Sequence, residues 1–524
     1  MDQKSKKVLV TGGAGFIGSN LVDALIERGF DVVVIDNLST GNKENIKNFL
    51  NYGKFKFING SLTDLNVCRQ AVKGIDYIFH LAAIPSVFRS VENPLATNEA
   101  NISGTLNLLI AARDEGSIKK FVYSSSSSVY GDSPKLPKQE DDPVNPISPY
   151  ALSKYTGERY CQIFNKIFGL PTICLRYFNV FGPRQNPLSQ YGAAIPKFVF
   201  SMIQNKSPII YGDGEQTRDF TYVDNVVEAN VLAVQSKHSG EVINVACNQR
   251  ISLNQIIELI NGFLKTNIKA LYYSPRPGDV RHSLADVSKA KELLSYHPKV
   301  YFEEGLRETI NWFKGLKIYE ITERFASIRP AEERDINQIS GLYQKEIKTG
   351  FLSSFGPPFL NKLFQAIIRF DDTFCIVAEL DNQLAGFIVG VVNANKFYRD
   401  FTRKYSLRAG LSILLKSLKA KNLKKILETI FYLRKEGDLP PAELFVIVVG
   451  ERFQRQKLGT ALLENFIAEM KRLGVKSFRS TVSEKFKPTI AFYTKMGFKF
   501  HQPTEVHKGQ PSKTFTYNVL TDKD

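Results

Sequence analysis

Hydrophobic residues near the start of the chain alternate between short apolar runs and stretches of helical periodicity. Residues 7–11 form an apolar run that predicts a buried strand, and the next segment carries Leu21, Leu25 and Ile26 on one helical face. A second apolar run covers residues 31–35. This alternation predicts an α/β fold built on a doubly wound parallel sheet.

A glycine-rich turn lies between the first strand and the first helix, with the spacing G-x-x-G-x-x-G over residues 12–18. Gly12 permits the tight turn, Gly15 lets backbone amides approach a pyrophosphate at the helix N-terminus, and Gly18 lets the helix lie close to the strand. Asp36 ends the second strand, where an acid accepts both adenosine ribose hydroxyls and repels a 2′-phosphate. The pattern predicts a Rossmann-type NAD site.

A Tyr-x-x-x-Lys motif places Tyr150 and Lys154 on one face of a helix. The lysine ammonium can stabilise a phenolate, so a tyrosine with an ordinary pKa of roughly 10 can act as a base near neutrality. Such a base removes the proton of a sugar hydroxyl. The same spacing is also typical of ordinary surface helices, so the prediction depends on the neighbouring motifs.

A run of serines follows the strand predicted at residues 121–123. Ser124 to Ser128 precede Val129-Tyr130-Gly131 and place hydroxyl groups at the carboxyl end of the parallel sheet, beside the expected nicotinamide.

These features resemble the extended short-chain dehydrogenase/reductase family of nucleotide-sugar enzymes over roughly residues 6–315. Further motifs that carry the resemblance are His80-Leu81-Ala82-Ala83, Arg176-Tyr177-Phe178-Asn179-Val180-Phe181-Gly182-Pro183 and Arg218-Asp219-Phe220. Within the family, the chain is most similar to bacterial UDP-N-acetylglucosamine 4-epimerases and their uronic-acid-accepting relatives. The motifs for this are Ser86-Val87-Phe88-Arg89-Ser90, Leu136-Pro137-Lys138 and Gly278-Asp279-Val280-Arg281-His282-Ser283.

The serine run distinguishes the reactions known in this family. The 4,6-dehydratases carry Thr-Asp-Glu before Val-Tyr-Gly, and the uronate decarboxylases also carry a glutamate there, whereas this chain has Ser126-Ser127-Ser128. Without that acid and base, the enzyme cannot eliminate water, and oxidation at carbon 4 can only be reversed. Return of the hydride to the opposite face of the sugar inverts carbon 4, which is epimerisation. The resemblance implies that Tyr150 is the base, that Ser126 hydrogen-bonds the 4-oxygen, and that Lys154 holds the nicotinamide ribose while lowering the tyrosine pKa. A decarboxylase or 4,6-dehydratase is the alternative.

The resemblance also implies two sets of binding residues. Those expected to contact NAD are Gly12, Gly15, Phe16, Ile17, Gly18, Asp36, Asn37, Ser61, Leu62, Leu81, Ala82, Ala83 and Lys154. Ser61 departs from the family, which usually has an acid there to meet the adenine amino group. Those expected to bind the UDP-sugar are Ser86, Arg89, Asn179, Arg218, Arg276, Asp279 and Ser283. Arginine forks match pyrophosphate oxygens, and a carboxylate can accept a ribose hydroxyl.

Ser283 bears on the choice of sugar. Epimerases restricted to sugars without an acetamido group place a bulky tyrosine at this position. The tyrosine would fill the space that an N-acetyl group needs, whereas a serine leaves that space open. We therefore expect UDP-N-acetylhexosamines, or their uronic acids, as substrates. The alternative is that Ser283 only lines a loop.

The hydrophobic pattern restarts after Trp312, and a chain of 524 residues is long enough for two or three domains. An apolar strand at 443–449, the segment 454–463 that enters a helix, and the run 492–498 together resemble the GNAT superfamily of acetyl-CoA-dependent N-acetyltransferases over roughly residues 322–522. We therefore expect an epimerase at 1–318, made of a Rossmann fold with a smaller substrate-binding subdomain, and an acetyltransferase at 322–524.

In the second domain, backbone amides at a helix N-terminus are expected to hold the CoA pyrophosphate. The residues expected to do so are Arg455, Gln456, Lys457, Leu458, Gly459 and Thr460, although Lys457 replaces a glycine of the family pattern. Tyr493 is expected to protonate the departing thiolate, and Glu443 to act as a base through water. The alternatives are a core role for Tyr493 and a non-catalytic CoA-binding module.

Positive charge is concentrated in one segment of the second domain. The chain has a net charge of +17, and residues 396–435 hold 12 basic and 2 acidic residues among leucines and isoleucines at helical spacing. This predicts a basic helical insertion with three interpretations: a solvated face over an apolar core, a funnel for acidic substrates, or peripheral contact with a membrane. Nucleic acid is not expected as a partner, because no binding motif accompanies the charge.

The remaining features bear on the compartment. The five cysteines lack C-x-x-C spacing and indicate neither a disulfide framework nor a zinc site. Residues 1–7 run directly into the first predicted strand, so we expect no signal peptide, and no apolar run reaches membrane-spanning length. We expect a cytoplasmic homodimer that combines 4-epimerisation with acetyl transfer to an amine, such as an amino sugar, for polysaccharide synthesis.

Overall fold

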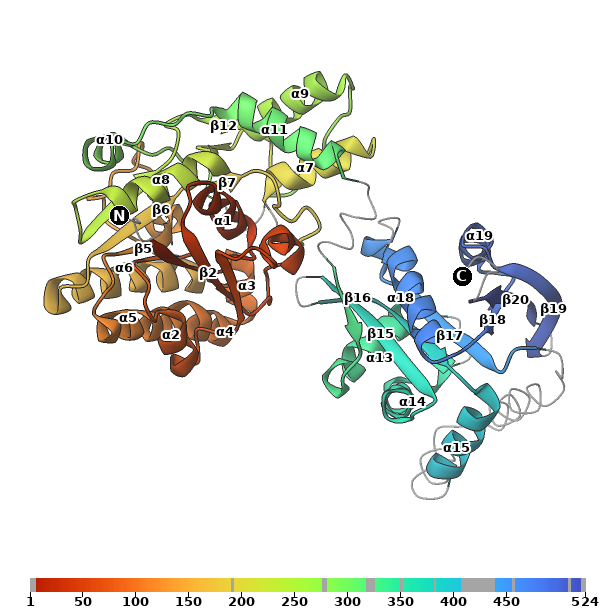
Figure 1. Cartoon of the computed structure of the whole chain (residues 1–524). Helices are drawn as coiled ribbons and strands as arrows, with labels where there is room; N and C mark the ends of the chain where they lie inside the picture. Colours follow the sequence, from red (N-terminus) through yellow and green to blue (C-terminus); the bar gives the residue numbers. More distant parts are fainter. Residues whose placement is uncertain are drawn as a thin grey trace. The chain divides into compact units, whose positions relative to one another are not determined.

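The computed structural model describes residues 6–189, 193–275, 280–316, 326–348, 352–380, 383–406, 439–454, 458–507 and 510–519. The chain folds as two compact units, Met1–Leu316 and Lys317–Asp524 (Figure 1).

The first unit is built on a seven-stranded parallel sheet with the order β11-β6-β5-β4-β1-β2-β3. Its strands are β1 (Lys7–Thr11), β2 (Asp31–Asp36), β3 (Phe55–Asn59), β4 (Tyr77–His80), β5 (Lys120–Ser126), β6 (Thr172–Tyr177) and β11 (Glu241–Val245). The strand order reverses between β1 and β4, and ligands of such sheets bind beyond the carboxyl ends at this point. The structure confirms the predicted doubly wound α/β fold.

Helices cover both faces of this sheet (Figure 1). On one face lie α2 (Leu65–Ala71), α5 (Gly104–Glu115) and α6 (Pro149–Phe168), and on the other lie α1 (Phe16–Glu27) and α8 (Val223–Gln235). Apolar residues of α2, α5 and α6 form a buried cluster with strands β1, β2, β4, β5 and β6. This burial holds the carboxyl ends of the strands in fixed positions.

The first unit contains further helices, turns and short strands outside this sheet and its covering helices. Those before β6 are η1 (Lys43–Asn45), η2 (Lys47–Phe49), α3 (Val87–Glu92), α4 (Pro94–Asn98), η3 (Glu99–Ser103) and η4 (Ser127–Tyr130). Those after β6 are β7 (Val180–Phe181), α7 (Ala194–Ile203), β8 (Ile209–Tyr211), β9 (Thr217–Arg218), β10 (Thr221–Tyr222), β12 (Ile251–Ser252), α9 (Leu253–Leu264), β13 (Leu271–Tyr273), α10 (Ser288–Leu294) and α11 (Phe302–Lys314). Three small sheets pair β7 with β10, β9 with β12, and β8 with β13.

Helix α6 is fixed at both ends and at its middle. Ser148 caps its first turn by accepting the Ala151 amide, and Gly169 ends it in the left-handed region with φ 70°. At the middle, a Cβ added to the buried Gly157 would lie 2.2 Å from the Tyr123 hydroxyl. Glycine therefore allows α6 to lie directly against β5.

The second unit contains a seven-stranded mixed sheet with the order β14-β15-β16-β17-β18-β20-β19. Its strands are β14 (Ser327–Pro330), β15 (Thr373–Leu380), β16 (Gln383–Val391), β17 (Ala442–Val449), β18 (Ser477–Ser483), β19 (Lys499–His507) and β20 (Gln510–Asn518). Strands β17 and β18 are parallel and pair only at Ala442 with Phe478 and at Glu443 with Arg479. Beyond these pairs the two strands diverge and no longer pair.

Helices cover both faces of the second sheet as well. They are α13 (Ile336–Glu346), α14 (Pro357–Arg369), α15 (Ala394–Ser406), α18 (Leu458–Arg472) and α19 (Lys487–Lys495), with short turns η5 (Glu333–Asp335), η6 (Leu352–Phe355) and η7 (Glu451–Phe453). Helices α13 and α14 share a buried cluster with β15 and β16. Helix α18 packs on the sheet through Phe466, whose ring lies 5.4 Å from that of Phe374.

The predicted basic insertion at 396–435 falls largely outside the described residues, which include it only as far as Ser406. In that part, α15 buries Phe397 to 2% exposure against the core of the unit, while Lys396 forms an ion pair with Asp372. The first turns of the insertion are thus a solvated helical face over an apolar core. Within the described part of the chain, no helix has both the length and the apolar character needed to cross a membrane.

The contact at Gly157 predicts a large loss of stability on substitution. Gly157→Ala should lower the free energy of unfolding by about 1–3 kcal/mol, because the Tyr123 ring has no room for an added methyl group. Gly262→Ala is the matched control: this glycine lies inside α9 with no described atom within 4 Å of an added Cβ, so alanine should stabilise by about 0.5–1 kcal/mol. Urea denaturation of both variants measures the difference, and an unchanged Gly157→Ala midpoint would contradict the argument.

Candidate active sites

The glycine turn has the geometry of a cradle for a phosphate group. Gly12 has φ 68°, and a Cβ at this position would lie 2.8 Å from the backbone of Ala82. A Cβ at Gly18 would lie 2.2 Å from the Gly12 carbonyl oxygen, so both glycines are required by close approach. Gly15 precedes α1, and no side chain in the described structure caps this helix. Its first-turn amides, from Phe16 and Ile17 onward, are the type of group that binds an anion.

Asp36 lies beside this turn, at the end of β2. Its carboxylate accepts hydrogen bonds from the amides of Ala14 (3.0 Å) and Leu38 (2.8 Å). Burial raises the pKa of Asp36, and these two hydrogen bonds oppose that effect. A carboxylate oxygen has a second lone pair, so each oxygen can still accept a ribose hydroxyl.

The other predicted NAD contacts lie near the same edge. Leu81, Ala82 and Ala83 follow β4, and the Ala82 amide donates to the Thr11 hydroxyl at 3.1 Å. Asn37 is exposed next to Asp36. Ser61 follows β3, and its hydroxyl lies 2.9 Å from that of Thr63, while the neighbouring Leu62 is buried.

Three hydroxyl groups form a chain at the end of β5. The Ser126 hydroxyl lies close enough to that of Tyr150 to lower the Tyr150 pKa by hydrogen bonding. Ser126 in turn accepts from the Ser128 hydroxyl at 2.9 Å and from the Ser128 amide at 3.2 Å. The structure therefore brings the predicted base and the predicted hydrogen-bond donor together.

Lys154 lies one turn along α6 from Tyr150 and is buried to 3% exposure. Its ammonium group donates to the Ser124 carbonyl oxygen at 2.7 Å and lies 5.3 Å from the centre of the Tyr123 ring. Burial lowers the pKa of Lys154 to about 8, and the charge of Glu158 opposes this shift.

The electrostatics of Tyr150 differ from the expectation. Burial raises the pKa of Tyr150, and the opposing influence is its hydrogen bond with Ser126 rather than the charge of Lys154. The expected net lowering of this pKa is therefore not found in the isolated protein. The contacts of Lys154 and Tyr150 with NAD and sugar remain predictions.

The predicted substrate residues Asn179 and Ser283 meet although they are far apart in sequence. The Asn179 side-chain amide donates to the Ser283 hydroxyl at 3.1 Å and to the Asp219 carbonyl oxygen at 3.2 Å. Asn179 has φ 34°, a conformation that asparagine tolerates better than most residues. Arg218 lies on β9, and its guanidinium donates to the Arg281 carbonyl oxygen at 3.0 Å.

Of the remaining predicted substrate residues, Ser86 and Arg89 lie at the start of α3. Ser86 has φ 95° and caps α3, and the partly exposed Arg89 lies in the first turn of that helix. Arg276 and Asp279 lie outside the described residues.

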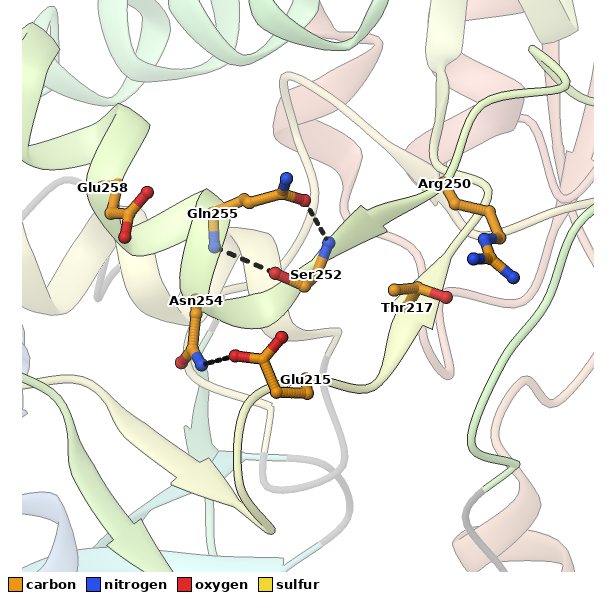
Figure 2. A pocket seen from close by; sticks show the side chains of 7 residues that line it. All are labelled: Glu215, Thr217, Arg250, Ser252, Asn254, Gln255 and Glu258. Atoms are coloured by element: carbon orange, nitrogen blue, oxygen red, sulfur yellow. Dashed lines mark hydrogen bonds between the residues drawn. The ribbon is translucent and has the colours of Figure 1, made fainter.

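A pocket of about 330 Å³ opens elsewhere in the first unit, between β9, β12 and α9 (Figure 2). Its lining residues are Glu215, Thr217, Arg250, Ser252, Asn254, Gln255 and Glu258. Ser252 and Gln255 cap α9 through reciprocal hydrogen bonds of 3.2 and 2.8 Å, and Glu215 accepts from Asn254 at 2.6 Å. None of the described residues that the sequence assigns to the site lines this pocket.

In the second unit, the two predicted catalytic residues lie near the point where β17 and β18 diverge. The Tyr493 hydroxyl lies 3.1 Å from that of Ser480, which also lies 3.1 Å from the Leu444 carbonyl oxygen. Ser480 and Leu444 directly follow the last paired residues of β18 and β17. Burial raises the pKa of Tyr493 to about 12, so this group is a phenol near neutrality and can donate a proton.

Glu443 lies 3.9 Å from Arg479 on the neighbouring strand, and both side chains are largely buried. Burial raises the pKa of Tyr398 in α15. The charge of Glu443 raises this pKa as well, whereas the charge of Arg479 lowers it. The predicted base is therefore part of a polar cluster to which the insertion contributes.

The predicted CoA loop is described in part. Leu458, Gly459 and Thr460 form the first turn of α18, whereas Arg455, Gln456 and Lys457 lie outside the described residues. A Cβ at Gly459 would make only ordinary contacts of 3.7–3.9 Å with Phe492 and Val449.

Comparison with known proteins identifies the family of each unit. Residues 8–246 match the NAD dependent epimerase/dehydratase family. A UDP-glucose 4-epimerase of Mycolicibacterium smegmatis is 38% identical over 310 residues, which cover 59% of this chain and 98% of that protein. The chain belongs to the NAD dependent epimerase/dehydratase family. Residues 343–498 match the acetyltransferase (GNAT) family, so the second unit is an acetyltransferase-family domain.

Solved structures similar to the epimerase unit include two sugar-nucleotide complexes. A UDP-N-acetylglucosamine 4-epimerase of Methanobrevibacter ruminantium, in complex with UDP-N-acetylmuramic acid, is 46% identical, with a TM-score of 0.57 over 60% of this chain and 99% of that one. A UDP-glucuronic acid 4-epimerase of Bacillus cereus, in complex with UDP-glucuronic acid and NAD, is 35% identical, with a TM-score of 0.56 over 59% of this chain and 100% of that one. Both family resemblances drawn from the sequence are thereby confirmed.

Sequence reasoning overlooked two groups that support the epimerase centre. Asn101 is buried in η3, and its side-chain amide donates to the Ser153 hydroxyl at 3.0 Å, while its oxygen accepts the Ile84 amide at 2.8 Å. Asn101 thus ties α6 to the loop after β4. Glu158 was also overlooked. It lies four residues after Lys154, as Lys154 lies four after Tyr150, so helical spacing places it on the same face of α6.

Proposed function

We propose that this chain is a bifunctional sugar-nucleotide enzyme. Its epimerase unit uses NAD to epimerise a UDP-N-acetylhexosamine, or the corresponding uronic acid, at carbon 4. Its second unit transfers the acetyl group of acetyl-CoA to an amine. The observation that carries the first activity is the hydroxyl chain of Ser128, Ser126 and Tyr150, with Lys154 on the same helix.

NAD fits the epimerase unit because the turn at Gly12 leaves no room for a side chain and Asp36 lies where the ribose hydroxyls of a dinucleotide bind. When bound, NAD supplies the hydride acceptor and donor for carbon 4. Tyr150 takes the proton of the 4-hydroxyl and later returns it, while Ser126 hydrogen-bonds the same oxygen. The ammonium of Lys154 lies on the same helical face, and we propose that it stabilises the phenolate once NAD and sugar are bound, an effect that the Tyr150 pKa in the protein alone does not include.

The serines favour epimerisation over elimination. Ser127 and Ser128 occupy the positions at which related dehydratases carry an acid and a base. The Ser128 hydroxyl already donates a hydrogen bond to Ser126. A hydroxyl group at these positions is too weak an acid and base to expel water from the sugar.

An acetamido sugar is the proposed substrate because of the contact at Ser283. Its small side chain meets Asn179 directly, so a larger residue at this position would fill the space beside the asparagine. A similar epimerase acts on UDP-N-acetylglucosamine by name and binds UDP-N-acetylmuramic acid. An amino-sugar nucleotide is the proposed acetyl acceptor, since the epimerase unit acts on the same class of molecule.

For the second unit, the proposed reaction places the pantetheine between the diverging strands β17 and β18. The Tyr493 phenol, at the point of divergence, protonates the departing thiolate. Glu443 accepts the amine proton through water. The first-turn amides of α18 hold the pyrophosphate.

The quaternary state and compartment of the protein are also proposals. Exposed apolar side chains on one face of α6, including Leu152, Ile163 and Ile167, support a homodimer, which sedimentation of the whole chain measures. We propose the cytoplasm as compartment, because NAD, UDP-sugars and acetyl-CoA are available there. Cell fractionation checks this.

The role of Tyr150 predicts the effect of removing its hydroxyl. Tyr150→Phe should lower kcat for the interconversion of UDP-N-acetylglucosamine and UDP-N-acetylgalactosamine by about 10²–10⁴-fold while leaving NAD bound. Tyr160→Phe on the same helix is the control and should keep normal turnover, because Tyr160 only packs against the core. Near-normal turnover of Tyr150→Phe would show that another group is the base.

The size of residue 283 predicts substrate choice. Ser283→Tyr should suppress turnover of acetamido sugars at least tenfold more than turnover of UDP-glucose and UDP-galactose, because only the former need the space. Ser283→Ala keeps the space and loses two hydrogen bonds, from the Asn179 side chain and the Asp219 amide, so it should affect both classes equally. If Ser283→Tyr reduced both classes alike, residue 283 would not select the sugar.

The helix N-terminus at Gly459 predicts acetyl-CoA binding. At a hundredfold excess over Kd, acetyl-CoA should stabilise the second unit by about 2.7 kcal/mol, measured as a thermal shift. Gly459→Asp should abolish the shift by placing a negative charge near the phosphates, while epimerase activity persists. Gly459→Ala should bind normally, because its methyl group has room. Calorimetry that detects no binding to the wild-type chain would overturn the transferase proposal.

A further inference from the structure

Glu158 lies on the same face of α6 as the catalytic pair, one turn beyond Lys154 and two beyond Tyr150. It is 1% exposed. A carboxylate is rarely buried to this extent unless other groups compensate its charge, so its surroundings define its role.

The Glu158 carboxylate is tied to the two strands beneath α6. One oxygen accepts from the Ser125 hydroxyl of β5 and from Nε of Arg176 on β6 at 2.8 Å. The other accepts from Nη2 of Arg176 at 2.8 Å, which completes a two-pronged contact. Arg176 is itself fixed, since it stacks 4.7 Å from the centre of the Tyr130 ring. The helix is therefore held in register against the strands that carry the serines.

The charged and titratable groups around Lys154 come from three elements besides its own turn. His80 of β4 is buried between the hydroxyls of Thr11 and Thr105, and burial lowers its pKa to about 3, so it is neutral. Tyr123 of β5 has its pKa raised by burial and is also neutral. On α6 itself, Tyr150 is a phenol before proton transfer and Glu158 is an anion.

Beyond this group, Arg176 of β6 is a cation whose fork faces Glu158. The influences on the pKa of Lys154 are burial, which lowers it, and the Glu158 charge, which raises it. Among these described neighbours, Glu158 is thus the anion that favours the ammonium form of Lys154.

We propose that Glu158 is a positioning residue of the epimerase: its buried carboxylate keeps Lys154 in the ammonium form and fixes α6 against β5 and β6. This inference rests on the proposed epimerase function. Glu158 itself contacts neither sugar nor cofactor in this proposal, and it acts through Lys154.

The effect on the pH profile has a definite sign. Activity requires charged Lys154 and falls as pH rises through the lysine pKa. Removing the Glu158 charge lowers that pKa further below about 8, so the alkaline limb of the profile moves to lower pH. Loss of activity should therefore be greatest on the alkaline side and smallest near pH 6.5.

The experiment measures kcat and KM of the whole chain with NAD and UDP-N-acetylglucosamine between pH 6 and 10. In Glu158→Gln, the alkaline limb of kcat should move down by about one pH unit, with a loss of about tenfold at pH 9. KM should stay within about twofold, because the substrate residues are unchanged. Ser125→Ala is the matched control: it removes one hydrogen bond to the same carboxylate but leaves the charge, so the limb should not move.

Two further variants keep the test decisive if Glu158→Gln folds poorly. Glu158→Gln combined with Arg176→Gln leaves no buried charge unpaired; because losing the Arg176 cation favours the ammonium, the limb should still move down, but less than in Glu158→Gln alone. Glu158→Asp keeps the charge and should restore the alkaline limb even where stability is reduced.

The outcomes distinguish a failure of the role proposed for Glu158 from a failure of the proposed epimerase function. An alkaline limb that stays in place in both Glu158→Gln variants, while the wild-type chain epimerises normally, would overturn the role of Glu158 alone. Absence of epimerisation by the wild-type chain on any UDP-sugar would overturn the proposed function, and this inference with it.

Discussion

The epimerase unit depends on the close contact between helix α6 and strand β5. Gly157 lets the helix lie against Tyr123, and this contact fixes the height of Tyr150 and Lys154 over the carboxyl end of the sheet. Ser126 ends β5 at the same level, so base and hydrogen-bond donor meet. A wider spacing between helix and strand would separate these hydroxyls, because both are carried on rigid elements.

The two units apply the same physical principle to different ligands. In each, a parallel strand leads into the N-terminus of a helix, where backbone amides lack partners within the helix and attract phosphate groups. The epimerase unit adds a glycine turn with φ 68° at Gly12, whereas the second unit adds two strands that diverge after Glu443 and Arg479.

Burial sets the protonation states in both units. It lowers the pKa of Lys154 to about 8 and that of His80 to about 3, and it raises the pKa of Tyr493 to about 12. The lysine in the epimerase centre is therefore close to titration, while the phenol of the second unit is firmly protonated. The charge state of Lys154 then depends on nearby anions. Glu158 is such an anion, and its charge raises the pKa of Lys154.

The sequence by itself determined what short-range spacing controls: the strand, glycine turn and helix at Gly12, the shared face of Tyr150 and Lys154, and the α/β fold. Spacing and side-chain period appear directly in the sequence, and the alternation of apolar runs with helical periodicity indicates the fold class. Only the tertiary structure decided which distant groups meet, as in Asn179 with Ser283 and Glu158 with Arg176. It also decided the pKa of Tyr150, because desolvation depends on everything packed around a group and not on its neighbours in sequence.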